Sequence, residues 1–263
     1  MSRSLPLIIL RFDSLPSTNT EAARQAMQGA AEGLCVMARE QTAGRGRQGR
    51  DWLSPKDAGL YFSIVLRPRL ALSCWPLLTL MAAIAVRDAV QEACALKADI
   101  KWPNDLLVND LKLCGILAET IETESGRTAI VGIGINLSER ALPPHLRETA
   151  TSIEAAIGST PDAETILRPL VRHLARRYAE LHEADGPAAI LRAWATASSY
   201  AEGRPVRVTL NDEVVAGTTR GLEPDGALRV ETSAGEIKIV RAGDVTALRA
   251  GLKSSVPRRR SIQ

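Results

Sequence analysis

The chain has 263 residues, of which 45% are hydrophobic and only 3% aromatic, and its formal net charge is +3. This composition predicts a globular protein with an aliphatic core, and the small charge argues against a general nucleic-acid binder. The apolar run near the N-terminus is too short for a signal peptide, and no stretch reaches the ~20 apolar residues of a spanning helix. We therefore expect a cytoplasmic protein that does not enter a membrane.

The four cysteines and three histidines of the chain predict no metal site. No two cysteines have the C-x-x-C spacing that is typical of zinc ligands. Cys35 and Cys114 lie in apolar runs, so we expect both to be buried free thiols of a protein from a reducing compartment.

The first elements of the chain are short. Apolar runs at residues 7–12 and 34–38 predict two strands. Between them, Ser17-Thr18-Asn19-Thr20 is rich in residues that begin helices, so a short helix should extend to about Met27. The second strand leads through Gln41 into a loop of unusual composition.

This loop, residues 44–50, alternates three glycines with three arginines. Glycine lets a ligand approach the main chain, and arginine supplies the planar charge that suits phosphate or carboxylate. Gly44, Gly46 and Gly49 match the dinucleotide-binding pattern G-x-G-x-x-G, but that pattern should open a helix, whereas residues 60–66 read as a strand. A small anionic ligand is favoured over nucleic-acid backbone because the arginines are few and separated by glycine.

The middle of the chain predicts a largely antiparallel sheet. A helix is expected at residues 73–96, where apolar side chains recur with helical spacing. Asn109-Asp110 separates apolar runs at 105–108 and 111–117, which indicates a hairpin, and another strand is expected at 128–136. We expect the helices to pack on one face of this sheet.

The C-terminal third changes from helices to short strands. Residues 137–150 read as a loop, helices are expected at 162–182 and 187–198, and residues 203–249 hold several β-rich runs between turns, which predicts a small barrel. The domains expected are a catalytic domain, a barrel and a disordered tail, at residues 1–200, 203–250 and 251–263.

Three clusters in the middle of the chain carry polar groups suited to chemistry. Lys101-Trp102-Pro103-Asn104-Asp105 forms a rigid irregular turn because Pro103 excludes helical geometry at Trp102. Lys112 is the one cation of an apolar run, and it is either a surface residue or a buried partner for an anion. The glycines of Gly132-Ile133-Gly134 leave space above one sheet face, either for a ligand or for tight packing against a helix.

Taken in order, these motifs resemble the bacterial biotin protein ligase family. The match extends from about Phe12 to about Arg249 and rests on five segments, which are residues 17–20, 41–52, 101–105, 112–119 and 132–137. It implies an α+β catalytic domain, with a mixed and largely antiparallel sheet packed with helices, followed by a small SH3-like barrel. The implied activity uses ATP and Mg²⁺ to form biotinyl-5′-AMP from biotin, and then transfers biotin to one lysine of a carrier.

The resemblance also implies roles for individual residues. Contacts to the ureido end of biotin are expected from Ser17, Thr18, Asn19 and Gln41. The loop over biotin and its adenylate is expected to use Gly44, Arg45, Gly46 and Arg47. The nucleotide side is expected to involve Arg50 and Trp52, with a more loosely aligned contribution from the barrel residue Arg249.

The remaining motif residues complete the implied site. Lys112 should bridge the biotin carboxylate and the α-phosphate, and Gly115 and Leu117 should line the biotin pocket. Positions near the nucleotide and the attacking amine match Asn104, Asp105 and Asn136. The groups expected to act in catalysis are Lys112, Arg47, Arg45 and Asp105, and no metal ligands are expected from the protein.

The partner implied is a biotin carboxyl carrier protein or carrier domain of acetyl-CoA carboxylase or a related carboxylase. About a dozen residues precede the match, so we expect no helix-turn-helix, no specific DNA and no repressor role, while a homodimer stays open. The loop at 138–152 should order over adenine, although Ala150-Thr151-Ser152-Ile153 stands where some relatives have a tryptophan. Three alternatives stay open, namely a lipoate or octanoate ligase, a nucleic-acid module and a structural scaffold.

Overall fold

The computed structural model describes residues 5–210 and 213–247. Seven strands form one sheet in the order β1-β2-β3-β7-β6-β5-β4, and five strands form a second sheet in the order β11-β10-β9-β8-β12. The strands of the first sheet are β1 (Ile8–Phe12), β2 (Leu34–Ala38), β3 (Gly59–Leu66), β4 (Asp99–Lys101), β5 (Asp105–Val108), β6 (Leu111–Thr123) and β7 (Gly126–Asn136). The helices are α1 (Thr18–Met27), α2 (Leu77–Cys94), α3 (Ile153–Ile157), α4 (Ala163–Leu181) and α5 (Gly186–Ala197).

The first sheet is mixed and largely antiparallel, as the family resemblance implied. Only β1 and β2 run parallel, and every other neighbouring pair is antiparallel. The glycine-containing strand β7 lies between β3 and β6, so it occupies the middle of the sheet. The expected hairpin is confirmed as β5 and β6, with a bulge at Leu106/Leu107.

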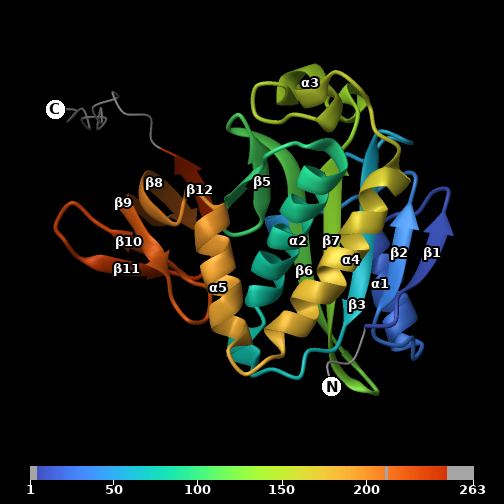
Figure 1. Ribbon diagram of the computed structural model, residues 1–263, viewed down its shortest axis with the longest axis horizontal. Helices are drawn as coiled ribbons and strands as arrows, with labels where there is room; N and C mark the ends of the chain where they lie inside the picture. The colour runs from blue at the N-terminus through green and yellow to red at the C-terminus, as the bar shows by residue number, and fades with distance from the viewer. Residues whose placement is uncertain (1–4, 211–212, 248–263) are drawn as a thin grey trace, which may run out of the picture.

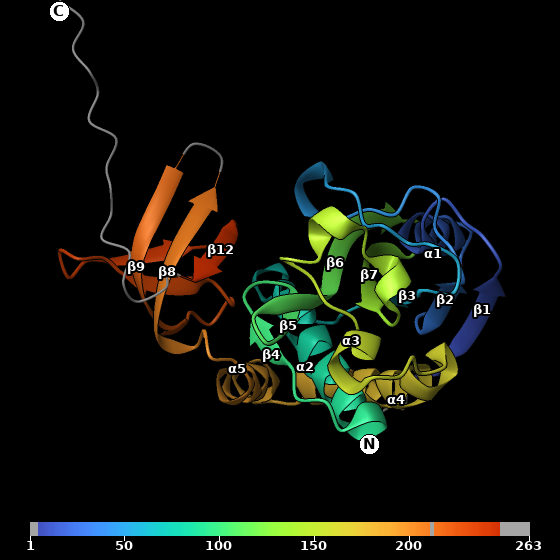
Figure 2. The same cartoon turned by 90° about the horizontal axis from the view of Figure 1, so that it is seen from above.

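Helices cover both faces of the sheet, so the expectation of a single covered face is wrong. Helices α2 and α4 pack together on one face, with α5 beside α2, whereas α1 lies on the opposite face (Figure 2). The alternation of side chains along each strand explains this division. On β7, Ile133 and Ile135 point into the large core under α2, and Ile130 points into a smaller core under α1. Since α1 is short, no helix among the described residues covers the middle of this face of the sheet.

Helix α2 is the central helix of the large core. It begins after Pro76, where a ring without an N–H is tolerated, and it is buried along most of its length. The segment Leu72–Cys94, which includes α2, is long and apolar enough to cross a membrane, yet most of it is buried inside the protein, as in the core helix of a soluble protein. Each buried leucine or isoleucine of this kind contributes about 1.5–3 kcal/mol through the hydrophobic effect.

The second sheet lies beside β5 and α5 (Figure 1), and contains β8 (Glu202–Leu210), β9 (Glu213–Leu222), β10 (Leu228–Glu231), β11 (Ile237–Val240) and β12 (Asp244–Ala247). The Trp102 Nε1–H donates to the Gly226 carbonyl at 2.9 Å, and this bond joins the second sheet to the turn between β4 and β5. The expected disordered tail at 251–263 lies outside the described residues.

Three details differ from the expectations. Residues 99–101 form the short strand β4, which was not expected, and two 3₁₀ turns, at Glu139–Ala141 and Pro144–Leu146, interrupt the segment expected to be a loop. The helix expected at 73–96 begins four residues later, because residues 72–74 form a separate 3₁₀ turn. Cys35 and Cys114 are buried free thiols, as expected, and burial raises the pKa of Cys35 to about 12.

Candidate active site

A cavity of about 110 Å³ lies on the sheet face that carries α1, between the middle strands and the loop at residues 44–50. Most residues singled out in the sequence line it together, although they come from distant parts of the chain. They are Ser17, Thr18, Asn19, Gln41, Arg45, Gly46, Arg47, Arg50, Trp52, Asn104, Asp105, Lys112, Gly115 and Leu117.

Three of the expected residues are not among those lining the cavity. A Cβ on Gly44 would lie 2.3 Å from the Trp52 carbonyl oxygen, so this glycine permits the loop to fold closely on itself. Asn136 is buried, and its amide donates to the Thr151 carbonyl at 3.0 Å. Its amide therefore holds the segment after β7. Arg249 lies outside the described residues.

The glycines of β6 and β7 make room for side chains of other elements above the sheet. A Cβ on Gly132 would lie 2.1 Å from the Asn19 Oδ1, and a Cβ on Gly134 would lie 2.4 Å from the Trp52 Nε1. Gly115 likewise lies under Trp52. These glycines therefore admit Asn19, the second residue of α1, and the tryptophan that follows the loop, and not a packed helix.

A chain of hydrogen bonds fixes the polar floor of the cavity. Gln41 Oε1 accepts from the Thr18 main chain at 2.8 Å and from its hydroxyl at 3.1 Å, while Gln41 Nε2 donates to Ser54. The fully buried Ser63 on β3 contacts Thr18 Oγ1 at 2.8 Å and Asn19 Oδ1 at 2.6 Å. Its single proton is shared between two acceptors, so both residues are held against the sheet.

Each arginine of the loop contacts a partner from another part of the protein. Arg45 pairs with Glu119 at 2.8 Å, Arg47 donates to the Asn104 amide oxygen at 3.1 Å, and Arg50 pairs with Asp244. The last pair joins the loop to β12 of the second sheet. The loop also turns through left-handed backbone at Gln48 and Gly49, with φ of 56° and 72°. Arg45 and Arg50 are therefore each paired with a carboxylate, whereas Arg47 contacts a neutral amide.

Lys112 lies at the centre of the cavity wall. Its Nζ is 2.7 Å from Asp105 Oδ1 and 5.4 Å from the centre of the Trp52 ring, so it combines an ion pair with a cation–π contact. The Asp105 Oδ1 atom is buried, and the Lys112 ammonium lies directly beside it. Burial lowers the pKa of the neighbouring Lys101 and of Arg47.

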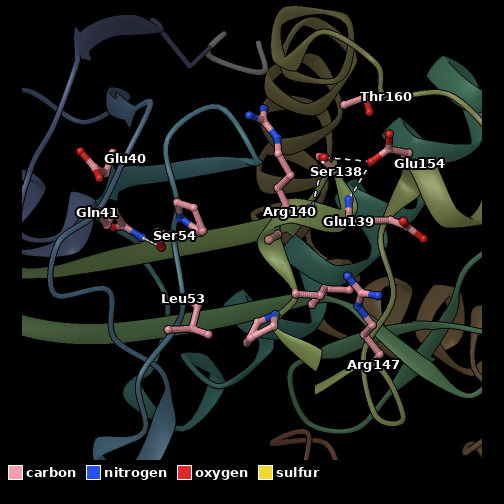
Figure 3. A pocket seen from close by; sticks show the side chains of 14 residues that line it. Glu40, Gln41, Leu53, Ser54, Ser138, Glu139, Arg140, Arg147, Glu154 and Thr160 are labelled. Carbon is pink, nitrogen blue, oxygen red and sulfur yellow. Dashed lines mark hydrogen bonds between the residues drawn. The ribbon is translucent and has the colours of Figure 1, made fainter. Parts of the chain in front are cut away.

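A second and wider groove, of about 910 Å³, lies on the far side of the Gln41–Ser54 hydrogen bond (Figure 3). Its walls come from the residues before β3 and from the segment between β7 and α4. Glu154 accepts from the Ser138 hydroxyl at 2.8 Å and from the Glu139 N–H at 2.7 Å, which ties that segment together. The lysine, arginine and amide side chains expected to bind the ligand line the smaller cavity and not this groove. The larger volume therefore does not identify the active site.

Comparison with known proteins agrees with this geometry. Residues 11–136 match the biotin/lipoate A/B protein ligase family, and residues 203–246 match the biotin protein ligase C-terminal domain. The biotin–[acetyl-CoA-carboxylase] ligase of Paracoccus denitrificans is 36% identical over 236 residues, which are 87% of this chain and 96% of the relative. The chain belongs to the biotin protein ligase family. Another member, the bifunctional ligase/repressor BirA of Bacillus subtilis, is 37% identical over 240 residues, 89% of this chain and 72% of BirA.

Solved structures of the family share the same fold. A biotin protein ligase from Aquifex aeolicus in complex with biotin and ATP has a TM-score of 0.78 and 27% identity, and the match covers 92% of this chain and 99% of that one. A biotin protein ligase from Leishmania major in complex with biotinyl-5-AMP has a TM-score of 0.62 and 25% identity, over 90% and 100% of the two chains.

Sequence reasoning missed three residues that organise the site. Ser54 and Ser63 orient the floor, and Glu119 receives hydrogen bonds from both Asn19 and Arg45. The serines carry no motif signal, because their partners are distant in sequence. Glu119 is the last residue of the 112–119 segment. It follows Leu117 by two residues on β6, so its side chain lies on the sheet face that carries the cavity.

Proposed function

We propose that this protein is a biotin–[biotin carboxyl-carrier protein] ligase whose active site is the cavity around Lys112. It forms biotinyl-5′-AMP from biotin and ATP, and then transfers biotin to a lysine of a carrier protein or domain. The observation that carries this proposal is the convergence of the floor, the arginine loop and the Lys112–Asp105 pair on one cavity in a member of this family.

The floor of the cavity suits a ureido group in its donors and acceptors. The Asn19 NH₂ donates to Leu117 and Glu119, and its oxygen accepts from Ser63, which leaves one lone pair of that oxygen as an acceptor. Gln41 uses its oxygen on Thr18 and one N–H on Ser54, which leaves a second N–H as a donor. A ureido ring offers two N–H donors and one carbonyl acceptor. A dithiolane ring offers neither, so this pattern favours biotin over lipoate.

The cationic wall suits the reaction of two anions. Adenylate formation brings the biotin carboxylate to the α-phosphate of ATP, so negative charge must be neutralised where they meet. Lys112, Arg45 and Arg47 all line the cavity and supply fixed positive charge there. Mg²⁺ bound to ATP would neutralise part of the phosphate charge. The buried Trp52 N–H, which has no acceptor within the described residues, is a further donor for the ligand.

The second step needs an amine without its extra proton. Asp105 Oδ1 faces Lys112, so once Lys112 turns to the ligand this oxygen can orient or deprotonate the incoming lysine. The cavity must also widen first, because it is smaller than the roughly 300–1,000 Å³ of most ligand sites. Movement of the 44–50 loop and Trp52 would provide that space and would later exclude water.

We further propose a cytoplasmic enzyme that divides into a catalytic domain up to about residue 200 and a barrel domain from residue 203. The small net charge of +3 supports the absence of a specific DNA partner. The proposed activity is tested by incubating the protein with ATP, Mg²⁺, biotin and a biotin carboxyl carrier domain. Biotin on the carrier lysine is the expected result. A carrier that stays unlabelled beside an active control ligase would contradict the proposal.

A further inference from the structure

Glu119 joins two parts of the site that lie far apart in sequence. Its Oε2 accepts a hydrogen bond from the Asn19 amide at 2.7 Å and from the Arg45 guanidinium at 2.8 Å. Asn19 belongs to the floor of the cavity and Arg45 to the loop that covers it. Because one carboxylate oxygen receives both donors, the position of each donor constrains the other.

The orientation of the Asn19 amide depends on this contact. Its NH₂ lies between two acceptors, the Leu117 carbonyl at 3.2 Å and the Glu119 carboxylate, so its oxygen must face the other way, toward Ser63. The amide also fills the space above Gly132, where a Cβ would collide with it. Movement of the Asn19 side chain is thus transmitted to Glu119 rather than absorbed by empty space.

We propose that Glu119 is a positioning residue that couples occupation of the ureido end of the site to closure of the loop through Arg45. This proposal rests on the proposed function, because it takes biotin as the ligand of Asn19. Biotin holds the Asn19 amide in place, the amide holds the Glu119 carboxylate, and the carboxylate anchors the loop. Loss of Glu119 therefore releases the loop even when biotin occupies the floor.

The test uses biotin without ATP, so that binding is measured apart from catalysis. Calorimetry gives the affinity for biotin, and the rate of trypsin cleavage after the loop arginines reports closure with and without saturating biotin. The variants are Glu119→Ala and Glu119→Gln. The matched control is Glu122→Gln on the same strand, whose carboxylate pairs with Arg127 on the other face of the sheet.

We expect biotin to protect the loop of the unchanged protein and of Glu122→Gln to the same extent. Glu119→Ala should bind biotin roughly tenfold more weakly, because a charge-assisted hydrogen bond is lost, and its loop should stay cleavable at saturation. Glu119→Gln keeps an acceptor oxygen for Asn19 but loses the charge that holds Arg45. It should bind biotin within about twofold of the unchanged protein and still lose protection of the loop.

The outcomes that differ from these expectations contradict either the proposed function or the coupling through Glu119. Absence of biotin binding by the unchanged protein would overturn the proposed function and the coupling with it. Biotin binding without protection of the unchanged loop, or full protection in Glu119→Gln, would overturn the coupling alone. If Glu119→Ala fails to fold, as judged by circular dichroism, the Glu119→Gln comparison decides.

Discussion

Replacement of Lys112 by alanine is the sharpest perturbation of the proposed chemistry. The side chain is 33% exposed, and its ammonium lies between Asp105 and the Trp52 ring, on the wall that should receive the biotin carboxylate. Alanine removes a charge that interacts most strongly when the carboxylate attacks the phosphate. The activation free energy of adenylate formation should therefore rise by about 3–4 kcal/mol, which slows the step by about 200- to 1,000-fold.

The same change also affects the folded state, so the two effects must be separated. Asp105, which is 16% exposed, would lose its ion-pair partner at a cost of about 1–2 kcal/mol, reduced from that of a fully buried pair because water reaches the lysine. The double variant Lys112→Ala/Asp105→Asn removes the unpaired charge. It should recover most of the lost thermal stability without recovering adenylate formation.

The assay is biotin-dependent release of pyrophosphate from ATP in a single turnover, with unfolding followed in parallel. Near-normal pyrophosphate release by a folded Lys112→Ala protein would remove Lys112 from the mechanism. Recovery of activity in the double variant would show instead that the lysine acts only by balancing Asp105.

Three further predictions concern the loop and the wide groove. Arg47→Gly should let the adenylate escape, so that a bystander protein mixed with enzyme, ATP and biotin becomes labelled; an unlabelled bystander while adenylate still forms would show that Arg47 does not retain it. Trypsin should cut after the loop arginines much faster in the empty protein than in the biotin complex, and equal rates would indicate a preformed loop. Hydrogen bonds from the Glu139 N–H and the Ser138 and Thr160 hydroxyls lower the pKa of Glu154. The ionised Glu154 carboxylate should therefore stabilise the folded protein above about pH 4.5, and this stabilisation should be lost as the pH falls through the lower folded-state pKa. The melting temperatures of the unchanged protein and Glu154→Gln should then converge at acid pH, and a difference that stays constant down to the lowest pH at which both proteins fold would contradict this.

The sequence predicted the elements whose patterns are local. The α2, α4 and α5 helices, the β5–β6 hairpin and the β-rich C-terminal segment follow from periodicity and turn residues, with boundaries shifted by a few residues. The position of α1 on the opposite face was not predictable in this way. It depends on the alternation of side chains in β2, β3 and β7 and on how these distant strands pair.

The site was predictable where a motif places several functional groups close together in sequence. The arginine loop, the turn around Asn104 and the run after Lys112 converge as expected. Asn136 was assigned to the same site, but its amide is committed to Thr151. Ser63 and Glu119 escaped notice because their role consists of contacts with residues about 44 and 100 positions away in the chain.

The central claim is that one cavity activates biotin with ATP. The most direct test is pyrophosphate release by the purified protein with ATP and Mg²⁺, in parallel with biotin and with lipoate. The donors and acceptors at Asn19 and Gln41 and the cations around Lys112 predict release with biotin and little above background with lipoate. Release with lipoate but not with biotin, or with neither, would contradict the account.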